Sequence, residues 1–146
     1  MALTFKPLHP LLAAEAVGTD LSRPQTPAQL AEIVAGMDRY AVLVFRGQKL
    51  SEDQQIAYAK QLGPLDLGLR KIRKGQPHRF KHDELADISN VMVDGRIAPR
   101  DSSKIVNNIA NQLWHSDSSF QKPAARRSAN SVSPPFAGIA TACSIE

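Results

Sequence analysis

The chain has 146 residues, and its 18 Lys and Arg against 14 Asp and Glu give a formal charge of +4 at pH 7. A composition of 42% hydrophobic and 22% charged residues excludes a disordered chain, and no apolar run reaches the roughly 20 residues of a membrane span. The single cysteine, Cys143, excludes a disulfide framework and a cysteine-based zinc site, and it is typical of a reducing compartment. We therefore expect one globular domain, residues 1–146, in the cytoplasm and without a membrane partner.

The first half of the chain predicts a helix, a strand and a second helix. Thr26 is a typical N-cap and precedes apolar residues at helical spacing, so we expect a helix over about residues 27–39. The apolar run 41–45 is rich in β-branched residues and predicts a buried strand. The capping residue Ser51 begins a second expected helix, which ends at Gly63.

The second half predicts more loop than regular structure. Residues 65–80 show no hydrophobic period and indicate a long loop. Residues 88–93 predict a strand that enters a tight turn at 94–95, and residues 105–120 predict a partly extended segment. The tail 123–146 is rich in Ala, Ser and Pro and poor in large apolar side chains, which indicates an interrupted domain.

A cluster of cations occupies part of the expected long loop. Between residues 70 and 81, six basic residues occur without an acidic one: Arg70, Lys71, Arg73, Lys74, Arg79 and Lys81. Such a cluster fits a solvated loop, a site for a small anionic substrate, or a nucleic-acid contact. Only one aromatic residue, Phe80, is interleaved with the cations, so we expect no nucleic-acid partner.

His115 and Asp117 form the most informative pair of side chains. On an extended backbone, residues two apart project from the same face, so the imidazole and the carboxylate can converge on one point. Nitrogen and oxygen donors in this arrangement suit two of the three protein ligands of a non-haem Fe(II). A simple His–Asp hydrogen bond has the same spacing, so the pair alone leaves both interpretations open.

The sequence segments around the pair favour the metal site over the simple hydrogen bond. The pair lies in NQLWHSDSSF at 111–120, and five earlier segments accompany it: PLHP at 7–10, VLVFRGQ at 42–48, LSEDQQI at 50–56, LGPL at 62–65 and ELADISNV at 84–91. In this order, over residues of about 5–127, they resemble the taurine dioxygenase family of Fe(II)/2-oxoglutarate-dependent oxygenases. The resemblance is strongest to the subgroup that cleaves aryloxyalkanoates such as 2,4-dichlorophenoxyacetate.

The resemblance implies a fold of the α+β or mainly β class, a distorted jelly roll (double-stranded β-helix) with flanking helices, incomplete in this chain. His115 and Asp117 would be metal ligands, with no further catalytic residue. Fe(II), O2 and the cosubstrate 2-oxoglutarate would oxidise a small anionic substrate and release succinate and CO2. Hydroxylation beside the ether oxygen of a phenoxyacetate would yield a phenol and glyoxylate.

The resemblance also implies positions for substrate and cosubstrate. Lys71 and Arg96 fall where the subgroup has cations for the substrate carboxylate, which needs a charge-assisted donor in a dehydrated pocket. Thr141 loosely matches the family's threonine for 2-oxoglutarate. Three further positions near the substrate are matched by Asn111, Ser118 and Phe120.

The family's third iron ligand is a distant downstream histidine, followed by an arginine for 2-oxoglutarate, and neither occurs in this chain. We therefore expect residues 1–146 to be the truncated N-terminal part of a dioxygenase domain, inactive and poorly folded alone. We expect the full-length parent to act on aryloxyalkanoates as a homo-oligomer. The alternatives are a taurine, alkyl sulfonate or sulfate dioxygenase and a non-catalytic basic protein that binds anions.

Overall fold

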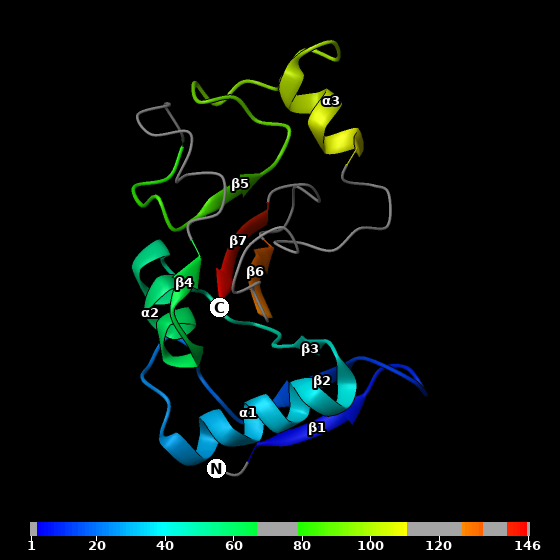
Figure 1. Cartoon of the computed structure of the whole chain (residues 1–146), viewed down its shortest axis with the longest axis vertical. Helices are drawn as coiled ribbons and strands as arrows, with labels where there is room; N and C mark the ends of the chain where they lie inside the picture. The colour runs from blue at the N-terminus through cyan, green and yellow to red at the C-terminus, as the bar shows by residue number, and fades with distance from the viewer. Residues whose placement is uncertain (1–2, 67–78, 111–126, 133–139, 146) are drawn as a thin grey trace. The chain divides into compact units, whose positions relative to one another are not determined.

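The computed structural model describes residues 3–66, 79–110, 127–132 and 140–145 (Figure 1). These residues belong to two compact units, an N-terminal unit that extends to Leu62 and a C-terminal unit from Gly63 onward. No helix in the described part of the chain is both long and apolar enough to cross a membrane.

The N-terminal unit contains a three-stranded mixed sheet. Strand β1 (Thr4–Pro7) pairs antiparallel with β2 (Ala14–Val17), and β2 pairs parallel with β3 (Leu43–Val44). Ala14 and Ala16 alternate with more exposed neighbours along β2 and are buried, as expected for a strand with one covered face.

Two helices complete this unit, and both follow the sequence prediction. Helix α1 (Pro27–Tyr40) begins with a capping box: the Gln29 amide donates to Thr26 Oγ1 at 3.3 Å, and the Thr26 amide donates to Gln29 Oε1 at 2.9 Å. Helix α2 (Glu52–Leu62) begins after Ser51, whose hydroxyl accepts from the Gln54 amide at 3.2 Å. Local capping chemistry therefore sets both starts.

In the core of the N-terminal unit, side chains of both helices pack with a side chain from the loop before α1. Leu21, Ile33 and Tyr58 are its buried centre. Partly buried apolar side chains pack around them: Leu3, Met37, Leu43, Phe45, Leu50 and Leu62.

The buried strand predicted over residues 41–45 is wrong in extent and in burial. Only Leu43 and Val44 are extended, and both side chains are half-buried. Residue 41 still belongs to the helix end, with φ of 59° and its amide bound to the Met37 carbonyl at 2.8 Å. Strand β3 then lies at the edge of the described sheet, where one strand neighbour gives only partial cover.

The C-terminal unit contains a four-stranded sheet around β7 (Ala140–Ile145). Strand β7 pairs antiparallel with β6 (Arg127–Val132) along its length, and with β4 (Leu65–Asp66) and β5 (Ala86–Ile88) in successive stretches. The tail, where no strand was predicted, thus supplies two strands of this sheet. Leu85, Ser89, Val91 and Ala98 are buried in the unit.

The tight turn expected at residues 94–95 is confirmed, whereas the strand before it is displaced. Gly95 has φ of 86°, and the Met92 amide donates to the Arg96 carbonyl at 2.7 Å. The extended strand β5 ends at Ile88, and beyond it only a single bridge joins Val91 to Ile97. Strand pairing with β7 therefore begins two residues earlier than the apolar pattern indicated.

The extended segment predicted from residue 105 is wrong up to residue 110, where helix α3 (Ser103–Ala110) lies instead. Ser102 caps it: its hydroxyl accepts from the Ile105 amide at 3.4 Å, and its carbonyl accepts from the Val106 amide at 3.1 Å. Of the long loop predicted over 65–80, residues 65–66 form β4, and 67–78 lie outside the described residues. The jelly roll implied by the resemblance stays a prediction.

Candidate functional site

A largely buried carboxylate side chain lies at the centre of a polar network in the C-terminal unit. Strand β5 presents Asp87, whose side chain is 10% exposed. Its Oδ2 accepts from Lys104 Nζ at 2.8 Å, and its Oδ1 accepts from the Ser89 hydroxyl at 2.6 Å. Arg79 Nη1 lies 3.5 Å from the same Oδ1. The desolvated carboxylate is thus paired with charge and with hydrogen bonds, as burial of an ion requires.

The partners of Asp87 are themselves tied to the backbone around them. Lys104 Nζ also donates to the Val91 carbonyl at 2.6 Å. The Ser89 hydroxyl accepts from the Val91 amide at 3.2 Å and from Arg79 Nη1 at 3.1 Å. Through these contacts, three separate pieces of chain share one network: residue 79, the continuous segment 86–91 that begins with β5, and helix α3.

Strand β7 carries one candidate position from the sequence, and helix α3 precedes the segment that contains several others. Thr141 of β7 is the register partner of Asp87 across the sheet. Helix α3 ends at Ala110, directly before the segment that begins with Asn111, and six residues of helix separate Lys104 from that end, about 9 Å along the axis. The network thus includes a residue of β5, which pairs with the strand that carries Thr141, and a residue of the helix that precedes the segment 111–120.

The other candidate side chains lie outside the described residues: Lys71, Asn111, His115, Asp117, Ser118 and Phe120. Among the residues that are described, no group of three His, Cys, Asp or Glu side chains is placed to hold a metal ion. The metal-ligand assignment of His115 and Asp117 thus stays a prediction from the sequence.

Arg96 is described, and its guanidinium has a carboxylate partner. Its Nη2 lies 2.6 Å from Asp94 Oδ2 and its Nε 2.7 Å from the same oxygen, with the arginine side chain 85% exposed. The side-chain hydrogen bond from Arg96 lowers the pKa of the Asp94 carboxyl, and the same bond raises the pKa of Arg96. An anionic substrate at Arg96 would have to compete with this carboxylate.

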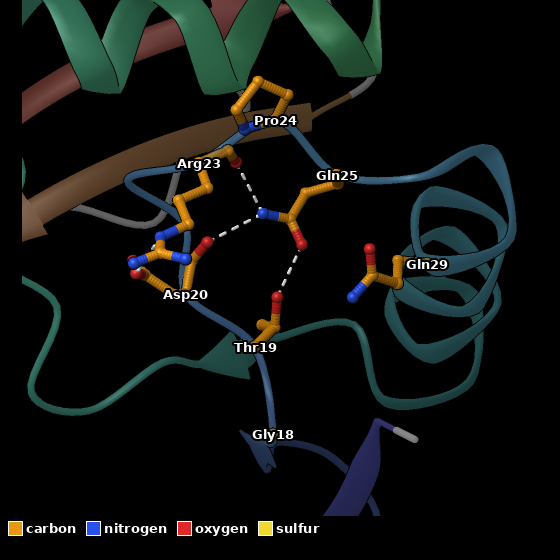
Figure 2. Close-up of a pocket in the computed structure, with 7 residues that line it drawn as sticks. All are labelled: Gly18, Thr19, Asp20, Arg23, Pro24, Gln25 and Gln29. Atoms are coloured by element: carbon orange, nitrogen blue, oxygen red, sulfur yellow. Dashed lines mark hydrogen bonds and ion pairs between the residues drawn. The ribbon is translucent and has the colours of Figure 1, made fainter. Parts of the chain in front are cut away.

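A shallow hollow of about 200 Å³ in the N-terminal unit is structural in character (Figure 2). Gln25 closes its wall: Thr19 Oγ1 donates to Gln25 Oε1 at 2.5 Å, and Gln25 Nε2 donates to the Asp20 and Arg23 carbonyls at 2.8 and 2.7 Å. The Gln25 backbone amide in turn donates to Gln61 Oε1 at 2.7 Å. These bonds hold the loop against α2, and no candidate residue from the sequence lines the hollow.

Sequence reasoning missed the role of Asp87, although one signal was present. Asp87 directly precedes the strand predicted over residues 88–93, and Ser89 lies two residues later, so on extended backbone their side chains share a face. The pairing with Lys104 had no such signal, because it depends on a helix that the sequence analysis did not predict.

Comparison with known proteins gives consistent matches. Residues 4–129 match the family described as taurine catabolism dioxygenase TauD, TfdA family. The chain is 52% identical over 145 residues to the alpha-ketoglutarate-dependent 2,4-dichlorophenoxyacetate dioxygenase of Cupriavidus pinatubonensis, covering 98% of this chain and 50% of that protein. Identity to the enzyme of the same name from a Burkholderia species is 49% over 145 residues, covering 98% and 48%.

A solved structure resembles the chain as well. The crystal structure of AAD-2 in complex with Mn(II) and N-oxalylglycine matches with a TM-score of 0.74 and 34% identity, covering 89% of this chain and 42% of AAD-2. The chain thus spans about half the length of the curated 2,4-dichlorophenoxyacetate dioxygenases that it matches.

Proposed function

Because the chain belongs to the taurine catabolism dioxygenase TauD, TfdA family, we propose that it is the N-terminal part of a 2-oxoglutarate-dependent dioxygenase acting on aryloxyalkanoates. The observation that carries this proposal is the 52% identity to a 2,4-dichlorophenoxyacetate dioxygenase across 98% of the chain. The substrate we propose is 2,4-dichlorophenoxyacetate or a close relative. Its cleavage yields a phenol and glyoxylate, with succinate and CO2 from the cosubstrate.

His115 and Asp117 are the proposed protein ligands of Fe(II) from this chain. The donor set fits the metal, because one imidazole nitrogen and one carboxylate oxygen suit Fe(II) and leave positions for further ligands. The bound iron would supply the chelation of 2-oxoglutarate and the activation of O2.

The remaining candidate residues would bind and orient the two organic acids. Lys71 and Arg96 are proposed to pair with the substrate carboxylate, and Thr141 to donate to 2-oxoglutarate. Asn111, Ser118 and Phe120 would shape the substrate pocket. For the fold, we propose a distorted jelly roll with flanking helices, incomplete in this chain.

Aryloxyalkanoates are favoured over taurine or alkyl sulfonates by the curated relatives. The two at 52% and 49% identity carry 2,4-dichlorophenoxyacetate in their names, and one from Delftia acidovorans at 29% is named for (S)-phenoxypropionate. A carboxylate beside an aryl ether is common to these named substrates.

The metal assignment can be tested in a hybrid protein. Residues 4–129 of this chain would replace the matching residues of the Cupriavidus relative, which supplies the rest of a complete dioxygenase. Anaerobic Co(II) titration, followed by visible absorption, should show one site that is lost in His115→Ala and in Asp117→Ala. His9→Ala is the matched control, since His9 is exposed and belongs to another part of the chain. Unchanged Co(II) affinity in His115→Ala would overturn the ligand assignment.

A further inference from the structure

The loop between β1 and β2, residues 8–13, presents apolar side chains to solvent (blue in Figure 1). Leu11 is 85% exposed, and Leu8 and Leu12 are each 47% exposed. Because these side chains gain little from packing, the conformation of the loop depends mainly on its hydrogen bonds.

Two backbone hydrogen bonds hold the base of this loop. The Leu8 amide donates to the Ala13 carbonyl at 2.9 Å and closes the loop. The Ala13 amide donates to the carbonyl of Tyr40, the last residue of α1, at 2.8 Å. Ala13 has φ of 66°, a conformation that is uncommon outside glycine. Neither bond contains an ionisable group, so a change of pH alters neither of them directly.

The middle of the loop is held by an ionisable side chain instead. The Leu11 amide donates to His9 Nδ1 at 3.2 Å. The imidazole thus takes the place of the asparagine or aspartate side chain in an Asx-turn, which accepts from the backbone two residues later. Pro10 lies between the two residues, and it has a fixed φ and no N–H that could compete for Nδ1.

The hydrogen bond from Leu11 to His9 exists in only one protonation state of the imidazole. Nδ1 accepts through its lone pair, so the neutral ring carries its proton on Nε2. When the ring takes up a proton from solvent, both of its nitrogens become donors. The Leu11 amide then faces a second N–H group, and the bond is lost.

Other charged groups occur on the elements that carry or adjoin the loop: Lys6 on β1, Glu15 on β2, and Asp38 and Arg39 on α1. Glu15 lies 3.6 Å from Arg46, and Asp38 has an interaction of its own. The Arg39 guanidinium lies 5.2 Å from the centre of the Tyr40 ring. Among all these side-chain types, imidazole is the one that changes charge between pH 5 and pH 8.

We propose that His9 is a pH-sensitive switch for the loop 8–13. The neutral imidazole holds the loop through the Leu11 amide, and protonation releases residues 9–11 while the two backbone bonds keep the base closed. The exposed Leu11 side chain is therefore held in one orientation above neutral pH and becomes mobile in acid. This inference does not depend on the proposed function, because it involves neither the metal nor a substrate.

The test uses the full 146-residue chain labelled with 15N, and it measures the NMR order parameter of the Leu11 amide at pH 8 and at pH 5. In wild type this value should fall from about 0.85, typical of rigid backbone, to below about 0.6, typical of flexible backbone. The amides of Leu8 and Ala13 should keep their order at both pH values. A Leu11 amide that is equally ordered at pH 8 and pH 5 would overturn the proposal.

Two variants separate the switch from a general effect of acid on the fold. His9→Asn keeps an acceptor that does not titrate, so the Leu11 amide should stay rigid at both pH values. His9→Ala has no acceptor, so this amide should be flexible at both.

Two further results with these variants would contradict the role of His9. If the Leu11 amide of His9→Ala were as ordered at pH 8 as in wild type, the hydrogen bond would not hold the loop. If His9→Asn lost its Leu11 order at pH 5 as wild type does, another group would be responsible. Either result would overturn the proposal.

Discussion

The Phe5 ring of β1 lies so close to Gly36 of α1 that a Cβ at residue 36 would be 2.6 Å from ring atoms Cε1 and Cζ. The Leu43 Cδ1 atom would lie at 3.2 Å from the same Cβ. Gly36 is buried in the middle of a helix, where glycine costs about 1 kcal/mol relative to alanine. Because Gly36 has no side chain, helix α1 can pack closely against the Phe5 ring of β1.

Gly36→Ala should destabilise the N-terminal unit despite its better helix propensity. Overpacking typically costs about 1–3 kcal/mol, and an aromatic ring held by a strand cannot move aside freely. Urea unfolding followed by circular dichroism measures the effect. Ala35→Gly at the exposed neighbour should cost about 1 kcal/mol through propensity alone. Adding Phe5→Leu should recover much of the loss, and a Gly36→Ala protein as stable as wild type would contradict the packing argument.

Tyr58 should make the stability of the chain fall in alkaline solution. Burial in the core raises the pKa of its phenol to about 12 from an ordinary value of 10.0. Between these values the unfolded chain loses the proton while the folded chain keeps it, so the unfolded state binds fewer protons and stability falls as pH rises. Below pH 10 this stabilisation is fully present.

Tyr58→Phe should remove this alkaline decline. The difference in unfolding free energy between wild type and Tyr58→Phe should shift by on the order of 2 kcal/mol between pH 9 and pH 12. Comparing the two proteins cancels the titration of other groups. A difference that stays constant over this range would show that the phenol does not ionise differently in the two states.

Lys71 should contribute to binding of the substrate anion in the hybrid protein. Lys71→Gln should raise KM for 2,4-dichlorophenoxyacetate about tenfold and leave KM for 2-oxoglutarate nearly unchanged, as expected when one substrate loses a charge-assisted contact. Steady-state rates at varied concentrations of each acid measure both constants. Equal increases for the two acids would indicate a general electrostatic role instead.

Arg96→Gln should have a smaller effect than Lys71→Gln. The guanidinium is largely exposed and already holds the Asp94 carboxylate at 2.6 Å, so water and an internal anion both reduce its attraction for a substrate. The same KM measurements compare the two variants. A larger effect at Arg96 would mean that the Asp94 contact opens when substrate binds.

The two long helices were predictable because their signals are local. Thr26 and Ser51 each form a cap with a glutamine three residues later, and such caps depend on adjacent residues only. Helix α3 has a local cap as well, Ser102. The polar and aromatic residues that follow the helix favoured a prediction of partly extended backbone over 105–120 instead. Its start was therefore missed although the capping residue was visible.

The strands of the C-terminal unit were not predictable from local pattern. Strand β7 pairs with residues 65–66 and 86–88, more than 50 positions earlier in the chain, and its own residues ATACSI carry no apolar alternation. Long-range pairing of this kind is decided by tertiary contact.

The candidate site also has one part that local sequence spacing predicts and another that depends on tertiary contact. His115 and Asp117 emerged from their two-residue spacing together with the family-like segment around them, whose family membership is confirmed. The Asp87–Lys104 pair joins residues 17 positions apart and exists only because α3 forms. Spacing rules suggest which residues act together within one element, but they do not identify partners on separate elements.

The most direct test of the central claim is product analysis of the hybrid protein. With Fe(II), 2-oxoglutarate and 2,4-dichlorophenoxyacetate in air, we predict 2,4-dichlorophenol and succinate in equal amounts from the unmodified hybrid. Neither product should appear above background with His115→Ala or Asp117→Ala, each checked by circular dichroism to be folded. Formation of both products at the unmodified rate by a folded His115→Ala hybrid would contradict the assignment of these residues as iron ligands.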